Sequence, residues 1–299
     1  MNEKFYLGTY TKRVSKGVYS VTLNKETAQL ESLTLEAAID NPTYLSYSKS
    51  DQLLIAVGKG EEHCGISASN ALTSPVEPLA SYDDQKAVPC YIRYNEKTGD
   101  VLTANYHGGF VELYHYDKED GAFTFVDKKV HSGSSVHANQ ASPHVHYTDY
   151  TPDEQWIVVC DLGIDTVFTY KRTEKGLEEV AQYKTKAGSG PRHLAFHPTL
   201  SIAYLICELD ATIEVLSYDK ENGTFKNLDK IALTTEDQQA WGGAIHITRD
   251  GRFLYASNRG FDALYTFSVD ATNGLLTLVL TIDSYRSVPP HFHLRNHEA

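Results

Sequence analysis

The chain has 299 residues, with 39 Asp and Glu against 27 Lys and Arg, which gives a formal net charge of −12 at pH 7. This negative charge argues against nucleic acid or an anionic membrane surface as a partner. No apolar run approaches the roughly 20 residues that cross a bilayer, and the N-terminus MNEKFYLGTYT lacks the basic and apolar regions of a signal peptide. We therefore expect a cytoplasmic protein, and the four widely spaced cysteines, which form no CxxC pair, fit a reducing compartment.

The first part of the chain reads as three short strands. The segments KFYLGTYT, GVYSVTLN and QLESLTLEAA each alternate between apolar and polar residues, as half-buried strands do. They resemble the last three strands of a four-stranded unit that lacks its first strand.

A recurring phrase divides the rest of the chain into further units. The phrase is a proline or small residue followed by a short alternating stretch, and it opens at six places: Pro42, Pro89, Pro143, Pro191, Ala244 and Pro290. Successive openings are 47, 54, 48, 53 and 46 residues apart. Five full units of four strands are predicted near residues 42–84, 88–130, 142–183, 190–232 and 243–281. Glycine-containing turns such as YDKENGTF separate strands within them.

A period of about 50 residues with four short strands per repeat predicts an all-β fold, a β-propeller in which neighbouring blades stack around a channel. No linker or second-domain signature interrupts the pattern, so residues 1–299 are interpreted as one domain. The stretch Val288–Ala299 reads as a first strand with nothing after it. It either completes the N-terminal sheet in a ring of six, or begins a seventh blade that this chain leaves truncated.

The candidate site residues lie near the first strands of different units or in the loops just after them. They are His144 and His146 in SPHVHYTDY, Arg192 in GPRHLAFHP, Glu208 in ICELD and Arg259 in ASNRG. Because the first strand of each blade lines the channel, these groups are expected to meet around one axis. Arginines can hold carboxylate or phosphate oxygens and stabilise developing negative charge, and a histidine can take a proton from water near neutral pH.

Each candidate also has a structural interpretation. Either histidine could be a hydrogen-bonded residue of an inner strand, Arg192 could brace neighbouring units through carbonyl groups, and Glu208 could form a structural ion pair. Asp161 and Asp165 in CDLGIDTV are interpreted as turn formers.

Other candidate chemistry is weaker in this sequence. Turn chemistry explains Asn105, which precedes Tyr106 and a glycine pair, and His63 beside Glu61, Glu62 and Cys64 is interpreted as part of a solvated loop because the spacing matches no zinc pattern. The sequence contains no GxSxG, HExxH or Walker-type motif. We therefore expect no metal, no cofactor and no covalent intermediate, and water activation as the chemistry.

Several motifs, in order, resemble a known family. SPHVH, DLGIDTV, GPRHLAFHP, CELDATIEV and DGRFLYASNRG are similar to the propeller-type 6-phosphogluconolactonases, a seven-bladed lactonase family that includes a carboxy-cis,cis-muconate cyclase. The resemblance covers essentially the whole chain. It implies that His144, Arg192, Glu208 and Arg259 are catalytic, and the adjoining His146, His193 and Asn258 are candidate substrate-binding residues. It also implies a sugar-acid lactone as substrate and no metal requirement.

The resemblance is incomplete at the C-terminus. The family continues for roughly one more blade after a PR-x-F element, whereas this sequence reads Pro290-His291-Phe292 there and ends at Ala299. The sequence thus favours hydrolysis of 6-phosphoglucono-δ-lactone, a small anionic sugar lactone. The alternatives are a muconate-lactonising cyclase, another sugar-lactone hydrolase, and a non-catalytic or disabled propeller.

Overall fold

The computed structural model describes residues 2–60, 64–234, 240–284 and 292. The predicted C-terminal strand from Val288 and the loop of Glu61, Glu62 and His63 lie outside these residues. The chain forms two compact units, Met1–Val130 and His131–Ala299, and each is described by itself. The single-domain interpretation stays a prediction.

The first unit contains three antiparallel sheets in its described residues. The first sheet has three strands: β1 (Glu3–Leu7), β2 (Val18–Asn24) and β3 (Gln29–Ala37). The second consists of β4 (Leu45–Ser48), β5 (Leu53–Lys59), β6 (Cys64–Asn70) and β7 (Glu77–Gln85). The third consists of β8 (Tyr91–Tyr94), β9 (Asp100–Asn105), β10 (Phe110–Asp117) and β11 (Ala122–Val130).

The second unit contains three four-stranded antiparallel sheets in its described residues. The first consists of β12 (Val145–Tyr150), β13 (Ile157–Asp161), β14 (Thr166–Thr173) and β15 (Gly176–Lys184), with the one-turn 3-10 helix η1 (Leu162–Ile164) between β13 and β14. The next consists of β16 (Pro191–Phe196), β17 (Ile202–Cys207), β18 (Thr212–Asp219) and β19 (Thr224–Ala232). The last consists of β20 (Trp241–Ile247), β21 (Phe253–Arg259), β22 (Ala263–Val269) and β23 (Leu276–Asp283).

The all-β prediction and the predicted order of the three-stranded and four-stranded sheets are confirmed. The three N-terminal strands and the five four-stranded sheets fall within a few residues of the predicted ranges. β4, β8 and β12 begin three residues after the predicted starts of their units, whereas β20 begins at Trp241, ahead of its predicted range. The Gly242 N–H donates to the Glu208 carbonyl at 3.0 Å, so a bond to the preceding sheet holds the start of this strand extended.

The core of the second unit lies on its second and third strands. All residues of β13 and β17 are buried, whereas β15, β19 and β23 are largely exposed. Tyr204, Ile206 and Ile213 of one sheet pack with Ala256 and Phe267 of the next, and each such apolar side chain contributes about 1.5–3 kcal/mol by burial. The unit is therefore held together by contacts between successive sheets.

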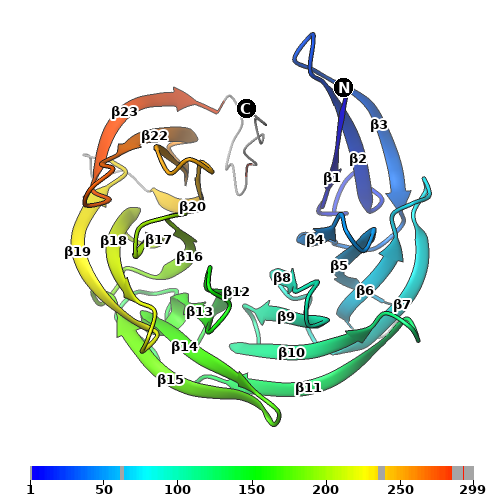
Figure 1. Cartoon of the computed structure of the whole chain (residues 1–299), viewed down its shortest axis with the longest axis horizontal. Coiled ribbons are helices and arrows are strands. Elements are labelled where there is room, and N and C mark those ends of the chain that lie inside the picture. The colour runs from blue at the N-terminus through cyan, green and yellow to red at the C-terminus, as the bar shows by residue number, and fades with distance from the viewer. Residues whose placement is uncertain (1, 61–63, 235–239, 285–291, 293–299) are drawn as a thin grey trace. The chain divides into compact units, whose positions relative to one another are not determined.

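The first strands of the second unit lie next to one another. β16 contacts both β12 and β20, while β15 contacts β19. Figure 1 shows β12, β16 and β20 on one side of this unit and β15, β19 and β23 on the other. Residues carried by the first strands of successive sheets are therefore brought together. Within the described residues, no helix is long and apolar enough to span a membrane.

Candidate active site

The first strands of the second unit share an irregularity that redirects side chains. In β12 the register shifts between Val145 and Tyr147, and in β16 it shifts between Pro191 and His193. The bulged residues are therefore His146 and Arg192, at equivalent positions of neighbouring sheets. A β-bulge bends its strand and re-aims the extra side chain, and bulges are frequent beside active sites.

A second pair of equivalent positions lies at the end of the second strands. Cys207 pairs with Thr212 on the next strand, and Asn258 pairs with Ala263 in the same way. Glu208 and Arg259 are the residues that follow these two, so they too hold the same position in neighbouring sheets. Their side chains meet, with 2.5 Å between Glu208 Oε2 and Arg259 Nη2.

Arg192 completes a group of three charged side chains. Its Nε donates to the same Glu208 Oε2 at 3.1 Å, so two guanidinium groups share one carboxylate oxygen. The side chains of Arg192, Glu208 and Arg259 are 7%, 16% and 17% exposed. The group carries a net positive charge in a mostly buried place, although the chain as a whole is acidic.

Two glycines at the start of β20 also hold the arginines. The Gly243 carbonyl accepts from Arg192 Nη1 at 2.8 Å, and the Gly242 carbonyl accepts from Arg259 Nη2 at 3.2 Å. A Cβ at Gly242 would lie 2.3 Å from the Cys207 carbonyl oxygen, so only glycine fits there. These carbonyls were not identified from the sequence; the glycine pair ahead of AIHIT is the only signal it carries.

The prediction that Arg192 could brace neighbouring sheets through a carbonyl is thus confirmed. The predicted pairing of Glu208 with an arginine is confirmed as well. Arg259 differs from Arg192, because its Nε is buried without a hydrogen-bond partner among the described residues. A buried N–H without an acceptor costs about 1–3 kcal/mol. Such a donor is suited to bind an oxygen of a ligand.

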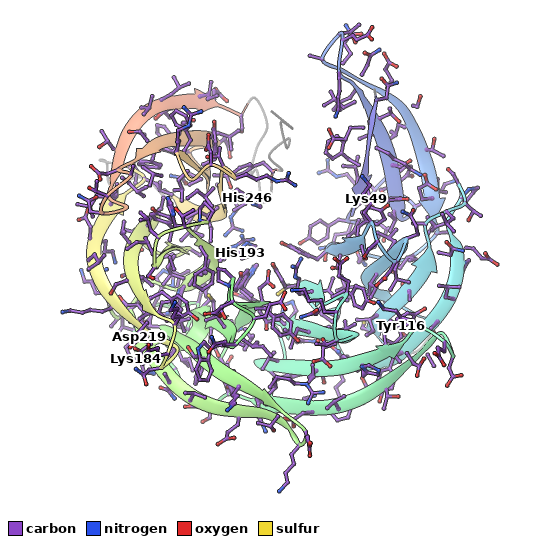
Figure 2. All side chains as sticks on the ribbon, viewed as in Figure 1. Lys49, Tyr116, Lys184, His193, Asp219 and His246 are labelled. Atoms are coloured by element: carbon purple, nitrogen blue, oxygen red, sulfur yellow. The ribbon has the colours of Figure 1, made fainter. Side chains whose placement is uncertain are left out.

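A histidine pair lies beside the arginines. His193 Nε2 and His146 Nδ1 are 3.2 Å apart, and their ring centroids are separated by 5.1 Å. Figure 2 shows His193 and His246 on the side of the unit where β12, β16 and β20 lie, away from Lys184 and Asp219. Burial, followed by the charges of Arg192 and Arg259, lowers the pKa of His146 well below 6.5. His146 is therefore neutral at neutral pH.

His144 precedes this pair and is half-buried. Its backbone N–H donates to Asp161 Oδ1 at 2.7 Å, and its carbonyl accepts from the Leu162 N–H at 3.0 Å. These bonds fix the backbone at the entrance to β12. The role of His144 as the proton acceptor stays a prediction.

Asn258 is completely buried between Ser257 and Arg259 on β21. Its side-chain amide lies against Tyr265 and offsets part of the rise that burial causes in the pKa of that phenol. Its substrate-binding role stays a prediction.

The remaining candidates have structural roles. Asp161 caps η1 by accepting from the Gly163 N–H, and Asp165 accepts from the Gly188 and Gly190 N–H groups, each at 2.7 Å. Asn105 accepts from the Gly108 N–H at 2.8 Å, so the turn interpretation is confirmed for Asn105 and Asp161, whereas the bonds of Asp165 reach residues 23 and 25 positions later. The four cysteines are free thiols, and no cluster of three or more His, Cys, Asp or Glu that could hold a metal occurs within the described part of the chain.

Comparisons with known proteins give one consistent result. The family model described as "Lactonase, 7-bladed beta-propeller" matches residues 4–299. The 6-phosphogluconolactonase of Bacillus subtilis is 34% identical over 295 residues, which cover 96% of this chain and 83% of that protein.

Solved structures agree with this result. A protein from Lactobacillus plantarum superposes with a TM-score of 0.94 at 37% identity, covering 98% of this chain and 86% of that one. The periplasmic gluconolactonase of Pseudomonas aeruginosa superposes with a TM-score of 0.88 at 29% identity, covering 97% and 84%.

Proposed function

Because the chain belongs to the lactonase family of seven-bladed β-propellers, we propose that its substrate is 6-phosphoglucono-δ-lactone and its product 6-phosphogluconate. The similarity to the Bacillus subtilis 6-phosphogluconolactonase supports this choice of substrate. The acidic chain must bind this anion through a local positive group, and the second unit contains one.

The observation that carries the proposal is the sharing of the Glu208 carboxylate oxygen by Arg192 and Arg259. One carboxylate compensates one of the two guanidinium charges, so the other remains for an anionic ligand. The buried Nε–H of Arg259 adds a donor that no described residue occupies. Guanidinium groups bind phosphate and carboxylate oxygens strongly, and they stabilise the oxyanion that forms in acyl transfer.

The reaction then requires few groups. A water oxygen attacks the lactone carbonyl carbon and loses a proton to a histidine, while the carbonyl oxygen becomes an oxyanion beside the arginines. When the bond from this carbon to the ring oxygen breaks, the ring oxygen takes the proton back. The proton acceptor in this mechanism is His144, in the SPHVH motif. His146, whose pKa is lowered well below 6.5, stays neutral and is assigned to substrate binding.

Glu208 is given an orienting role in this mechanism. Its bonds hold both guanidinium groups in place, and the Gly242 and Gly243 carbonyls accept further hydrogen bonds from the same two groups. Preorganised donors of this kind need no rearrangement during the reaction.

The experiment measures the disappearance of 6-phosphoglucono-δ-lactone above its spontaneous rate, with the purified chain and its Arg259→Ala variant. Removal of one oxyanion donor costs about 100- to 1,000-fold in kcat, so we expect Arg259→Ala to lose nearly all acceleration. Arg252→Ala is the control, since that side chain is 74% exposed and pairs with Asp250 on the surface. Full activity of Arg259→Ala would refute its assignment.

A second substrate tests the phosphate. Glucono-δ-lactone has the same ring without that group, and the proposal predicts a clearly lower kcat/KM for it. Equal kcat/KM values for the two lactones would contradict a phosphorylated substrate while leaving lactone hydrolysis in place.

A further inference from the structure

A buried chain of polar side chains lies directly behind the segment Pro143–His146. Tyr170 Oη is 2.9 Å from His131 Nε2, and His131 Nδ1 is 2.7 Å from Asp161 Oδ2. Asp161 is 0% exposed, and His131 and Tyr170 are buried as well. The mechanism proposed above uses none of these three residues.

The other oxygen of Asp161 reaches the segment itself. Asp161 Oδ1 accepts from the His144 N–H at 2.7 Å and from the Gly163 N–H at 3.0 Å. One carboxylate therefore joins the 3-10 turn to the residue that enters β12. His146 follows two residues later at the bulge, so the direction of both histidines depends on how this backbone is held.

A comparable chain in the first unit joins Gln85, the last residue of β7, to Asn105 and Tyr114, and it includes the buried carboxylate of Glu112, which accepts from Gln85 Nε2 and, at 2.7 Å, from Tyr114 Oη. Asn105 ends β9 as Asp161 ends β13, and its Nδ2 donates to Gln85 Oε1 at 2.7 Å. Gln85 Nε2 in turn donates to Tyr114 Oη at 3.0 Å. Gln85, Asn105 and Tyr114 thus correspond to His131, Asp161 and Tyr170.

Asn105 and Asp161 hold the backbone ahead of the first strand through different groups of the peptide. Ala87 and Pro143 each lie four residues before a tyrosine, Tyr91 and Tyr147, that pairs with the residue preceding Asn105 or Asp161. Asn105 Nδ2 donates to the Ala87 carbonyl at 2.9 Å, whereas Asp161 accepts from an N–H, that of His144. An amide can hold this peptide through its carbonyl; a carboxylate, which only accepts, holds it through its N–H. Bonds to a carboxylate are also about twice as strong as neutral ones.

We infer that Asp161, held by His131, is a positioning residue that fixes the His144 backbone and so directs the histidines of the Pro143–His146 segment toward the arginine pair. This inference rests on the proposed function for its catalytic readout. Asp161 acts through the segment and is assigned no contact with substrate.

The test uses the exchange that the chain itself provides. The double variant His131→Gln/Asp161→Asn places glutamine and asparagine where the first unit has Gln85 and Asn105, while Phe168 stays where that unit has Glu112. An amide at 161 keeps an acceptor oxygen and gains a donor. We expect its thermal midpoint to stay within about 3 °C of the wild type, a change of about 1 kcal/mol or less. We expect kcat to fall by about 10- to 100-fold, the effect of a small misplacement of a reacting group, with KM within twofold because both arginines remain.

Asp153→Asn is the matched control. Asp153 is a turn carboxylate at the far end of the β12–β13 pair, where it accepts from Thr151 Oγ1 at 2.6 Å. This variant should keep the wild-type kcat. A double variant with native stability and kcat within twofold of the wild type would overturn the inference, and so would one that loses stability and activity in parallel, because that pattern marks a structural role alone.

A second readout separates this inference from the proposed function. In nuclear magnetic resonance spectra, the His144 amide proton should move upfield in the double variant and its exchange should accelerate at least tenfold, and the ring signals of His144 and His146 should shift. If the wild-type chain hydrolyses no lactone, the proposed function fails, and these signals still decide the positioning. Unchanged His144 and His146 signals would overturn it.

Discussion

Replacing Glu208 by glutamine keeps the size of the side chain but removes the charge that Arg192 and Arg259 share. The two guanidinium nitrogens lie 3.1 and 2.5 Å from one oxygen, so they are at most about 5.6 Å apart. Two unit charges at that separation repel by about 3 kcal/mol when the effective dielectric constant is about 20. Removal of one partner from a buried pair is measured at about 3–5 kcal/mol. Both values lead us to expect that Glu208→Gln lowers the free energy of unfolding by about 3 kcal/mol.

Urea unfolding at low ionic strength measures this change. Glu178→Gln is the control, because Glu178 is an exposed carboxylate of the same unit. Inorganic phosphate should raise the urea midpoint of Glu208→Gln more than that of the wild type, since the variant has two uncompensated guanidinium groups. A loss below about 1 kcal/mol, the value of an exposed ion pair, would refute the view that this carboxylate compensates buried charge.

Two further predictions concern the histidine segment. The pKa of His146 is lowered below 6.5, so below pH 6.5 the unfolded chain binds a proton that the folded chain does not. The free energy of unfolding therefore falls as pH falls, by up to about 1.4 kcal/mol per pH unit for this group. His146→Asn should flatten that fall in unfolding measurements between pH 6.5 and 5, and an unchanged slope would contradict the shift. Gly163→Ala places a Cβ 2.0 Å from the Ser142 carbonyl oxygen and 2.7 Å from the His144 nitrogen; it should lower the thermal midpoint and the lactonase kcat together, and a variant that matches the wild type in both would show that this contact relaxes freely.

The repeat made the fold predictable. Each repeat carries its own turn residues. In three of the sheets, a glycine with positive φ (Gly121, Gly223 or Gly274) lies in the turn between the last two strands, where the sequence shows a polar stretch ending in glycine. Local signals of this kind determine where strands end. The early start of β20 was not predictable, because it depends on a bond to Glu208 in the preceding sheet.

The site was predictable in its members but not in its contacts. Arg192 and Glu208 occur in one repeat and Arg259 in the next; the three were expected to meet around the axis, and they do so through one carboxylate oxygen. The sequence could not reveal the Gly242 and Gly243 carbonyls as acceptors. The turn at Asp161 was predictable from its local sequence. Its bond to the His144 N–H was not, because it is a tertiary contact with a residue 17 positions earlier.

Equivalent positions explain how such a group can arise without a change of fold. Glu208 and Arg259 occupy one position in two successive sheets, and His146 and Arg192 occupy another. The backbone at each position is set by strand register and by the bulge, both of which are common to the sheets. A change of side chain in one sheet therefore alters one member of the group and leaves the strands in place. The same reasoning applies to Asp161, whose counterpart Asn105 performs the structural part of the task without a charge. The ionised version occurs where the following segment carries histidines, which is why we expect the exchange at 131 and 161 to spare stability and reduce activity.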